Sequence, residues 1–132
     1  MIINRRSDYA CRIIREAYRN KDRYISVADV AEAEGIPYAF ARSIQHDLVH
    51  AGILKTIRGA HGGLALACDP KETTVLDVLE ALQGPLCSST CCQDPECCQH
   101  SGECEFSKVW RKGDELLREY YSGVTLYGLF EK

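Results

Sequence analysis

The spacing of glycine and proline between residues 26 and 67 constrains the fold most strongly. A short amphipathic stretch begins at Ser26, whose hydroxyl can cap a helix, and ends at Gly35, because glycine adopts the left-handed conformation that helix ends need. Pro37 follows in the first turn of a second helix, where a missing N–H costs nothing. Gly52 ends that helix. A short helix, a glycine-containing turn and a second helix predict a helix-turn-helix.

Two short β-like runs follow the second helix directly. Leu54–Ile57 and Leu64–Ala67 have strand length, and residues 58–63 between them include three glycines. Glycine lets the backbone turn tightly and approach another molecule closely. A helix-turn-helix followed by such a hairpin predicts a winged helix. The alternative is an ordinary α+β domain whose hairpin has no role in binding.

Further helices are predicted on both sides of this unit. The first covers about Ser7–Arg19, with Ser7 or Asp8 as its cap. Another begins after Thr74, which forms a capping box with Asp77, and closes at residues 84–85. A short closing helix is expected over residues 125–130.

A long helix over residues 106–121 has a continuous apolar face. Its members are Phe106, Val109, Trp110, Gly113, Leu116, Leu117, Tyr120 and Tyr121. This is more apolar surface than a helix at the end of a small domain needs. The pattern therefore favours pairing with a second copy over packing on its own domain.

Charge is unevenly distributed along the chain. The net charge is −3, but residues 1–86 have 11 basic and 11 acidic side chains, so the deficit lies in the tail. Between residues 42 and 58 the charged residues are Arg42, Lys55 and Arg58 against Asp47 alone, beside two histidines. This local bias favours a surface that meets phosphate.

The polar face of the second helix and the hairpin tip contain the candidate DNA-binding residues. Recognition helices read base edges with long polar side chains, and an arginine on a glycine-rich wing suits a narrow minor groove. The candidates are Tyr38, Arg42, Ser43, Gln45 and His46 on the helix and Arg58, Gly59 and His61 on the wing. The alternative is that these are solvated surface side chains, with Arg58 contacting phosphate.

Cysteine is unusually frequent. The chain has eight cysteines, six of them between residues 87 and 104. We find no signal peptide and no apolar run long enough to cross a membrane, which predicts a cytoplasmic protein without membrane contact. Clustered cysteines in that compartment bind metal or sense redox state more often than they form disulfides. The two outlying cysteines, Cys11 and Cys68, are expected to be buried packing residues.

The cysteine spacing leaves several ligand sets open. Cys92, Cys98 and Cys104 are spaced C-x5-C-x5-C, and Cys91 and Cys97 repeat the same interval one residue earlier. Neighbouring side chains in an extended segment point in opposite directions, so one member of each pair should bind. Cys87 and His100 are further candidates. Thiolates suit iron–sulfur clusters and zinc alike, and a thiol–disulfide switch without metal is a third possibility.

The helix-turn-helix, the wing and the cysteine spacing together resemble a known family. The run GIPYAFARSIQHDLVHAGILKTIRGAHGGLALA is similar to the helix-turn-helix and wing of the IscR/NsrR-type iron–sulfur cluster transcriptional regulators. The capped VLDVLEAL helix and the C-x5-C-x5-C spacing follow in the same order, so the likeness covers essentially the whole chain. It implies a homodimeric regulator that binds a palindromic double-stranded DNA operator.

The resemblance also implies a cofactor and its ligands. Members of this family hold an iron–sulfur cluster with three cysteines, which correspond here to Cys92, Cys98 and Cys104. IscR-like members add a histidine three residues after the third cysteine, where this chain has Ser107. NsrR-like members use an aspartate in the first helix of the other subunit, which corresponds to Asp8. We therefore expect a [4Fe–4S] cluster, with [2Fe–2S] possible, that senses nitric oxide, redox or iron–sulfur status.

The predicted fold class is mainly α with a small β wing: a winged helix-turn-helix plus a long C-terminal dimerisation helix. Residues 1–86 form the DNA-binding domain, 87–104 the cysteine-rich cluster-binding loop, and 105–132 the dimerisation helix and C-terminal helix. Neither a G-x4-GK[ST] loop nor a GxSxG elbow is present, and we expect no enzyme. The alternative function is a zinc-binding or thiol-switch winged-helix regulator without an iron–sulfur cluster.

Overall fold

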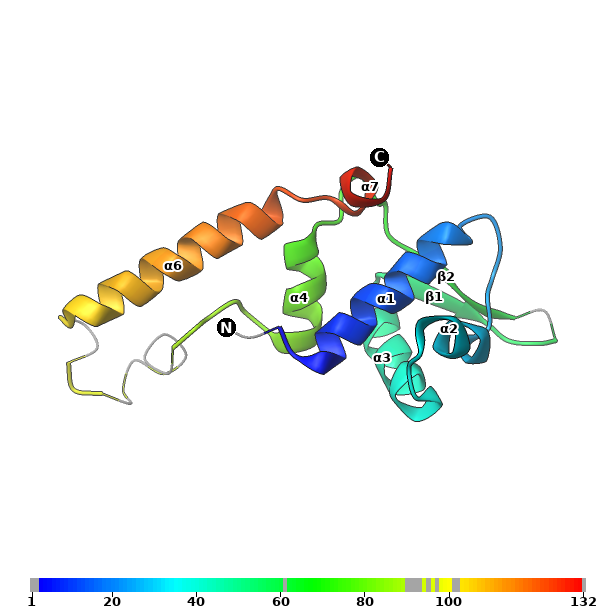
Figure 1. Cartoon of the computed structure of the whole chain (residues 1–132), viewed down its shortest axis with the longest axis horizontal. Coiled ribbons are helices and arrows are strands. Elements are labelled where there is room, and N and C mark those ends of the chain that lie inside the picture. Colours follow the sequence, from blue (N-terminus) through cyan, green and yellow to red (C-terminus); the bar gives the residue numbers. More distant parts are fainter. Residues whose placement is uncertain are drawn as a thin grey trace.

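The computed structural model describes residues 3–60, 62–89, 94, 96, 98–100 and 103–131. Its elements are α1 (Arg5–Arg19), α2 (Val27–Glu34), α3 (Tyr38–His50), β1 (Leu54–Ile57), β2 (Gly63–Leu66), α4 (Val75–Gln83), α6 (Glu105–Ser122) and α7 (Leu126–Phe130). The β1–β2 hairpin extends from one end of the helical body, and α6 extends from the other (Figure 1). The mainly helical fold with a small β wing is confirmed.

The core lies where α1 crosses the helix-turn-helix. Ile13 and Ile14 of α1 and Ile44 and Leu48 of α3 are at most 1% exposed, so the two helices share one apolar interior. α2, the hairpin, α4 and α7 close this interior with Val30, Ala31, Leu54, Leu64, Val78 and Leu126. Burial of these side chains is the main stabilising contribution to the fold.

Local capping signals explain where most helices begin and end. The Ser26 hydroxyl accepts from the backbone N–H of Asp29 at 3.1 Å, and Gly35 ends α2 with φ +66°. Both hydrogen bonds of the capping box between Thr74 and Asp77 are present at α4. These predictions are confirmed.

The start of α1 differs from the predicted start. Asn4 caps this helix by accepting from the backbone N–H of Ser7 at 2.8 Å, so α1 begins at Arg5, two residues before the predicted start. Neither Ser7 nor Asp8 is the cap. Ser7 is fully buried, on the side of α1 that faces the core.

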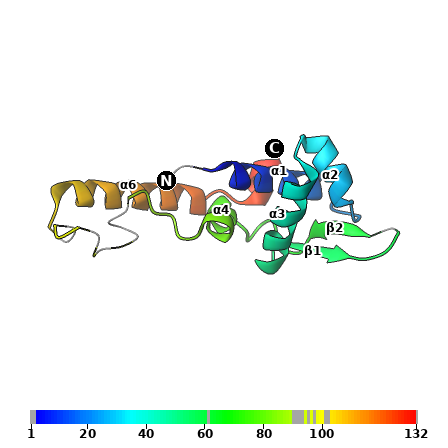
Figure 2. The same ribbon diagram turned by 90° about the horizontal axis from the view of Figure 1, so that it is seen from below.

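The hairpin is anchored to the segment before α2. β1 and β2 pair antiparallel with Leu54 opposite Leu66 and Ile57 opposite Gly63, so β2 begins one residue earlier than predicted. Ile25 extends this sheet through two backbone hydrogen bonds with Leu64, at 2.8 and 3.0 Å. Figure 2 shows the hairpin beside α3, with its tip extending beyond the helices.

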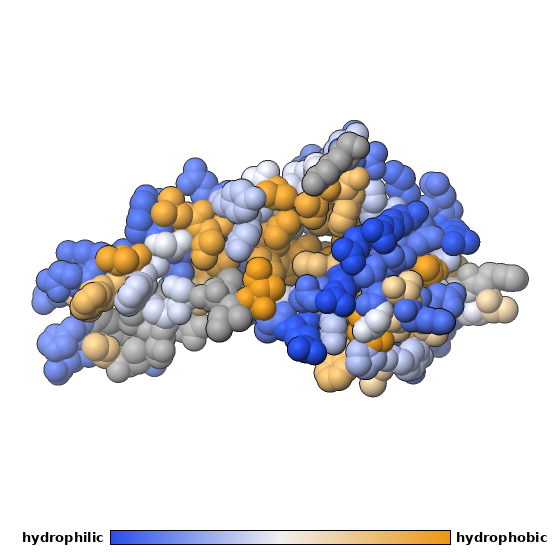
Figure 3. Space-filling model, viewed as in Figure 1, coloured by the Kyte–Doolittle hydropathy of each residue, from blue (hydrophilic) through white to orange (hydrophobic). Residues whose placement is uncertain are grey.

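The C-terminal end of α6 is joined to the segment before α4 by the main chain. The N–H of Val75 donates to the carbonyl of Val124, and the N–H of Leu126 donates to the carbonyl of Thr73, each at 2.9 Å. Most of the predicted apolar face of α6 is exposed, and Trp110 is 44% exposed. Hydrophobic side chains gather over this helix in Figure 3, whereas the surface over α1 is hydrophilic. None of the described helices is both long and apolar enough to cross a membrane.

Candidate nucleic-acid interface and cysteine loop

The outer stripe of α3 and the hairpin form the walls of one surface groove of about 520 Å³. Its lining includes Tyr38, Arg42 and Gln45 from α3 and Ile57, Arg58 and Gly59 from the hairpin. The three α3 residues recur at intervals of four and three, so their side chains lie on the same helix face. The fold thus brings the predicted recognition-helix residues and the predicted wing arginine together on one surface.

The α3 carboxylate, Asp47, does not neutralise the arginines of this surface, because it is already paired. Asp47 forms an ion pair with Arg6 of α1. Within the described residues, neither Arg42 nor Arg58 has an acidic partner, and both are exposed. Two uncompensated guanidinium groups at one groove are suited to phosphate or to guanine edges.

Two further α3 candidates lie outside the groove lining. Ser43 accepts a hydrogen bond from Arg6 Nη2 at 3.0 Å, so its hydroxyl helps to hold α3 against α1. His46 is exposed. The role of Arg6 has no periodic signal in the sequence, because it depends on a contact between residues that are far apart in the chain.

The glycines of the wing are required by close backbone contacts. A Cβ atom on Gly62 would lie 2.2 Å from the carbonyl oxygen of Ile57, and one on Gly63 would lie 2.3 Å from that of Ile25. Gly59 has φ +118°, which favours glycine, but the space around it is open. His61, predicted at this tip, lies outside the described residues.

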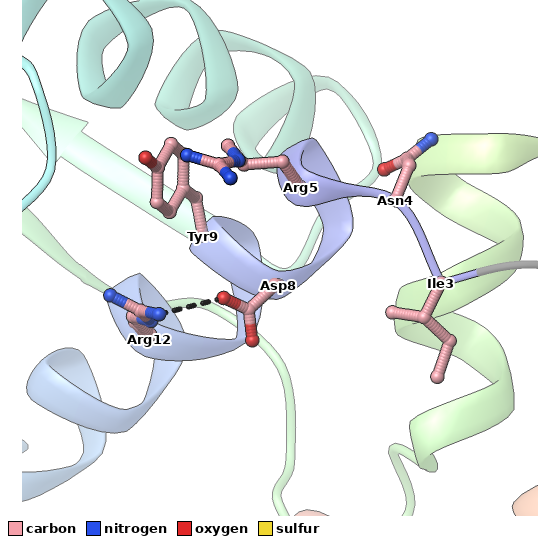
Figure 4. A pocket seen from close by; sticks show the side chains of 6 residues that line it. All are labelled: Ile3, Asn4, Arg5, Asp8, Tyr9 and Arg12. Carbon is pink, nitrogen blue, oxygen red and sulfur yellow. Dashed lines mark ion pairs between the residues drawn. The ribbon is translucent and has the colours of Figure 1, made fainter.

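Asp8 lies on the outer face of α1, at the edge of a surface pocket of about 520 Å³. Its carboxylate pairs with Arg12 at 2.9 Å, and its side chain is 53% exposed. Figure 4 shows these two side chains facing each other, with Arg5 beside Tyr9 across the pocket. A half-exposed carboxylate with a single ion pair can still accept a bond from another molecule.

Arg12 and Arg15 connect this face of α1 to the end of α2. Arg12 Nη1 donates to the carbonyl oxygen of Glu34 at 3.2 Å, and Arg15 Nη2 lies 2.5 Å from Glu34 Oε1. Burial alone would raise the pKa of Glu34, but the hydrogen bond and the charge of Arg15 outweigh it, so this pKa is lowered. Glu34 directly precedes Gly35, so α1 holds the turn of the helix-turn-helix.

The structure describes part of the candidate ligand set. Cys98 and Cys104 are free thiols, and Cys104 is the residue that precedes α6. The backbone N–H groups of Glu103 and Cys104 both donate to the carbonyl of His100, at 3.0 and 2.8 Å, while the His100 side chain is exposed. Cys91, Cys92 and Cys97 lie outside the described residues. Cys87, a further candidate, is disulfide-bonded.

The donor chemistry of this loop fits a soft metal centre. In the ranges that the structure describes, no three histidine, cysteine or acidic side chains are grouped as a metal site. Of the two described free thiols, Cys98 lies in the loop and Cys104 at the start of α6. Thiolates are ligands for iron–sulfur clusters and for zinc, so the donors fit both.

The two outlying cysteines differ from each other. Cys68 is half-buried against the core, close to its predicted role. Cys11 is exposed on the outer face of α1, so its predicted burial is wrong. Partial desolvation, with a smaller contribution from the nearby Asp8 carboxylate, raises the pKa of the Cys11 thiol. The apolar side of α1 is defined by Ala10, Ile13 and Ile14, and Cys11 falls outside it.

Two α6 residues that the sequence analysis did not single out hold the start of the cysteine loop. Both carboxylate oxygens of Asp114 accept from the backbone N–H of Ser88, at 3.1 and 3.3 Å. Arg118 donates to the carbonyl of Leu86 at 3.1 Å and to Glu80 of α4 at 2.7 Å. Their spacing of four residues places Asp114 and Arg118 on the same side of α6 and could have been found in the sequence. The stronger periodicity of the apolar residues conceals it.

Comparison with known proteins matches residues 3–132 to the Rrf2 family, described as an iron-dependent transcriptional regulator. A putative HTH-type transcriptional regulator of Aquifex aeolicus is 25% identical over 112 residues, which cover 83% of this chain and 78% of that protein. IscR of Yersinia pseudotuberculosis is 27% identical over 110 residues, covering 83% and 66%. The solved structure of T. potens IscR superposes with a TM-score of 0.79 at 21% identity, covering 99% of this chain and 87% of that one.

Proposed function

The chain belongs to the Rrf2 family of transcriptional regulators, and from this premise we propose that it is a homodimeric DNA-binding regulator controlled by an iron–sulfur cluster. The observation that carries the DNA-binding part is the shared groove of α3 and the hairpin, whose two arginines have no acidic partner among the described residues. The cluster part rests on the cysteine loop and on the family likeness.

In this proposal α3 enters the major groove and the wing approaches the minor groove. Arg42 and Gln45 suit guanine and adenine edges, and Arg58 suits the negative potential of a narrow minor groove. Gly59 lets the wing backbone approach the duplex closely. The remaining proposed contacts are Tyr38, Ser43, His46 and His61. Of these, Ser43 already accepts a hydrogen bond from Arg6, and its O–H remains available to donate to DNA.

Cys92, Cys98 and Cys104 are the proposed cluster ligands, with Asp8 of a second copy as the fourth. Cys91, Cys97, Cys87 and His100 remain the alternates, Cys87 only after reduction of its disulfide, and we favour [4Fe–4S] over [2Fe–2S]. When bound, such a cluster supplies a redox-active centre that nitric oxide or oxidants can modify. The carboxylate of Asp8 is a weaker partner for iron than a thiolate, which suits a site whose occupancy responds to a signal.

The contacts of Asp8 offer a route from the cluster site to the DNA-binding surface. Asp8 is bonded to Arg12, and Arg12 is bonded to the carbonyl of Glu34 at the end of α2. A ligand that engages Asp8 competes with Arg12 for the carboxylate, which loosens or redirects Arg12 at the turn before α3. Two sites are thereby coupled through α1, as ligand-controlled DNA binding requires.

The exposed apolar face of α6 is the proposed dimer interface. Its exposed large side chains are Phe106, Val109, Trp110, Leu116, Leu117 and Tyr120. Pairing of two such helices sets two recognition helices about 34 Å apart, which matches successive half-sites of a palindrome.

Anaerobic purification of the full chain, with iron, sulfide and zinc analysis, tests the cofactor. We expect a coloured protein with iron and sulfide in equal amounts; a colourless protein with stoichiometric zinc would overturn the iron–sulfur assignment. Gel-shift titration at several salt concentrations tests DNA binding independently. We expect one preferred palindrome and a steep loss of affinity with salt.

Substitution of Asp8 tests the fourth ligand. We expect Asp8→Ala to shorten the lifetime of the visible absorption in air, whereas Asp22→Ala, which removes an exposed carboxylate elsewhere, leaves it unchanged. Equal lifetimes of the two variants would remove Asp8 from the ligand set.

A thiol switch is the second candidate function, because Cys87 is disulfide-bonded while Cys98 and Cys104 are free. Reduction and re-formation of the disulfide at Cys87 would change the loop without any metal. In that case metal-free protein should show a reversible change of DNA affinity on treatment with dithiothreitol. The cluster proposal expects no such dependence in metal-free protein.

A further inference from the structure

One buried carboxylate joins the middle of α6 to the start of the cysteine loop. Asp114 is 6% exposed, and both of its oxygens lie within hydrogen-bond distance of the Ser88 N–H, at 3.1 and 3.3 Å. A charge removed from water is costly unless it is hydrogen-bonded, and a hydrogen bond to an ionised acceptor is stronger than a neutral one. The position of Ser88 relative to α6 is therefore tightly held.

Arg118, one helical turn further along α6, holds the preceding part of the same segment. It donates to the carbonyl of Leu86 at 3.1 Å and to Glu80 Oε1 at 2.7 Å. Leu86 is 2% exposed, so this carbonyl belongs to a buried part of the chain. Residues 86–88 are thus fixed between α4 and α6.

The far end of the loop is attached to the same helix. Cys104 immediately precedes α6 and lies ten residues before Asp114. At a rise of 1.5 Å per residue, the two attachment points are about 15 Å apart along the helix axis. The separation of the loop ends is therefore set by α6, and the entropy of closing the loop is lost on folding rather than on ligand binding.

On the basis of the proposed function, we propose that Asp114 is a positioning residue for the thiol ligands. By fixing Ser88 on α6, it sets the position of the start of the loop relative to Cys104, which lies at the other end of the loop. Arg118 links the same segment to α4, which packs against α1 and α3. The loop is thereby connected to the DNA-binding body by a second route, independent of Asp8.

Asp114→Asn tests this role in the full-length protein, with Glu115→Gln as the matched control. Glu115 is the adjacent acidic residue, and its side chain is 68% exposed. Hydrogen exchange of metal-free protein reports the contact itself. We expect the Ser88 amide to exchange about tenfold faster in Asp114→Asn, since the charged acceptor is replaced by a neutral one that forms a weaker hydrogen bond. Unchanged exchange would overturn the proposal.

Titration with Co²⁺ alone reports how well the thiols converge. Cobalt–thiolate absorption appears only when several thiolates bind one ion, and it requires no iron–sulfur cluster. We expect the Co²⁺ affinity to fall about tenfold in Asp114→Asn, as for other residues that orient ligands indirectly. The Glu115→Gln control should match the wild type. Equal affinities of the wild type and Asp114→Asn, or no cobalt–thiolate band in the wild type, would overturn the proposal.

Arg118→Gln provides a second test should Asp114→Asn fold poorly, as judged by far-ultraviolet circular dichroism. It removes the charged donor to Leu86, and we expect the same direction of change in Co²⁺ affinity. These readouts separate the two proposals. A colourless zinc protein whose Co²⁺ affinity still depends on Asp114 would reject the iron–sulfur function and support the positioning role.

Discussion

Burial and the contact with Arg15 act in opposite directions on the pKa of Glu34. Its side chain is 6% exposed, which disfavours a carboxylate, yet Arg15 supplies a 2.5 Å contact that more than compensates, and the pKa of Glu34 is lowered. A charge at the C-terminal end of a helix is also opposed by the helix dipole, so the arginine is needed there. The same arginine is partly exposed, which limits how much the pair contributes to stability.

We expect Glu34→Gln to lower the free energy of unfolding at pH 7 by about 1–2 kcal/mol. Because the folded pKa is lowered, the stabilisation is present above the unfolded glutamate pKa of about 4.3 and is lost as pH falls through the folded pKa. Urea unfolding at pH 7 and in steps below pH 5 measures both effects. Glu32→Gln, at an exposed position, is the control; an equal loss in both variants would contradict the role of the Arg15–Glu34 pair.

Arg58 is the wing residue on which the proposed DNA binding should depend most directly. Its guanidinium is exposed at the tip of the hairpin, beside the groove lined by Arg42. We expect Arg58→Ala to weaken operator binding about tenfold, measured by fluorescence anisotropy. If Arg58 contacts phosphate, the slope of log affinity against log salt concentration also becomes shallower by about one unit. Lys71→Ala, which removes a charge near α7, is the control, and an equal effect of the two changes would exclude a specific role.

At the scale of the element, the wing was predictable from its glycines but its anchorage was not. The Arg58–Gly63 segment predicted a tight hairpin, and β1 and β2 form it. What holds the hairpin is the bridge between Ile25 and Leu64, which joins residues 39 positions apart. No local pattern marks such a contact, because the segment around Ile25 is too short to read as a strand.

Gly63 should be the least replaceable glycine of the wing. It has φ +154°, and an added Cβ would lie 2.3 Å from the backbone oxygen of Ile25. We expect Gly63→Ala to cost at least about 2 kcal/mol of stability, from strain and overpacking together. Gly59→Ala, at φ +118° in open space, should cost clearly less. Thermal unfolding compares the two, and similar melting temperatures would contradict the close approach.

The capping motifs were the most predictable part of the elements. Ser26 and the Thr74–Asp77 pair act through hydrogen bonds within three residues, so they are visible in the sequence. The sequence does not reveal the cap of α1, because Ser7 has a good capping side chain but is buried within the helix. Tertiary packing thus assigned the role to Asn4.

At the scale of the whole molecule, α6 stands apart from the body (Figure 1), and most side chains of its apolar face are exposed. Within the described residues it packs mainly on α4. Contiguous exposed apolar surface of this kind marks a site of association. This geometry agrees with the proposal that a second copy covers it.

If two copies pair through α6 as proposed, we expect Trp110→Glu to convert the dimer to a monomer, because a charge on this face cannot be buried without a partner. Sedimentation velocity measures the change, and affinity for a palindrome should fall more than tenfold as two linked half-site contacts become one. Lys112→Glu alters charge on a side chain that is 63% exposed, and should remain dimeric. A Trp110→Glu protein that stays dimeric would place the interface elsewhere.

The sequence by itself determined the order and type of the elements, the winged helix and the presence of a thiol-rich loop. These follow from local periodicity, capping and glycine conformation, all of which act over a few residues. The tertiary structure decided which side chains share a surface. It placed α3 and the wing around one groove and brought Arg6 into contact with Ser43 and Asp47. It also left Cys11 exposed and attached the start of the loop to α6 through Asp114. Such contacts depend on how elements that are distant in the chain pack against each other. The burial of apolar surface drives this packing, and it is non-directional. A local sequence pattern therefore does not show which side chains will meet.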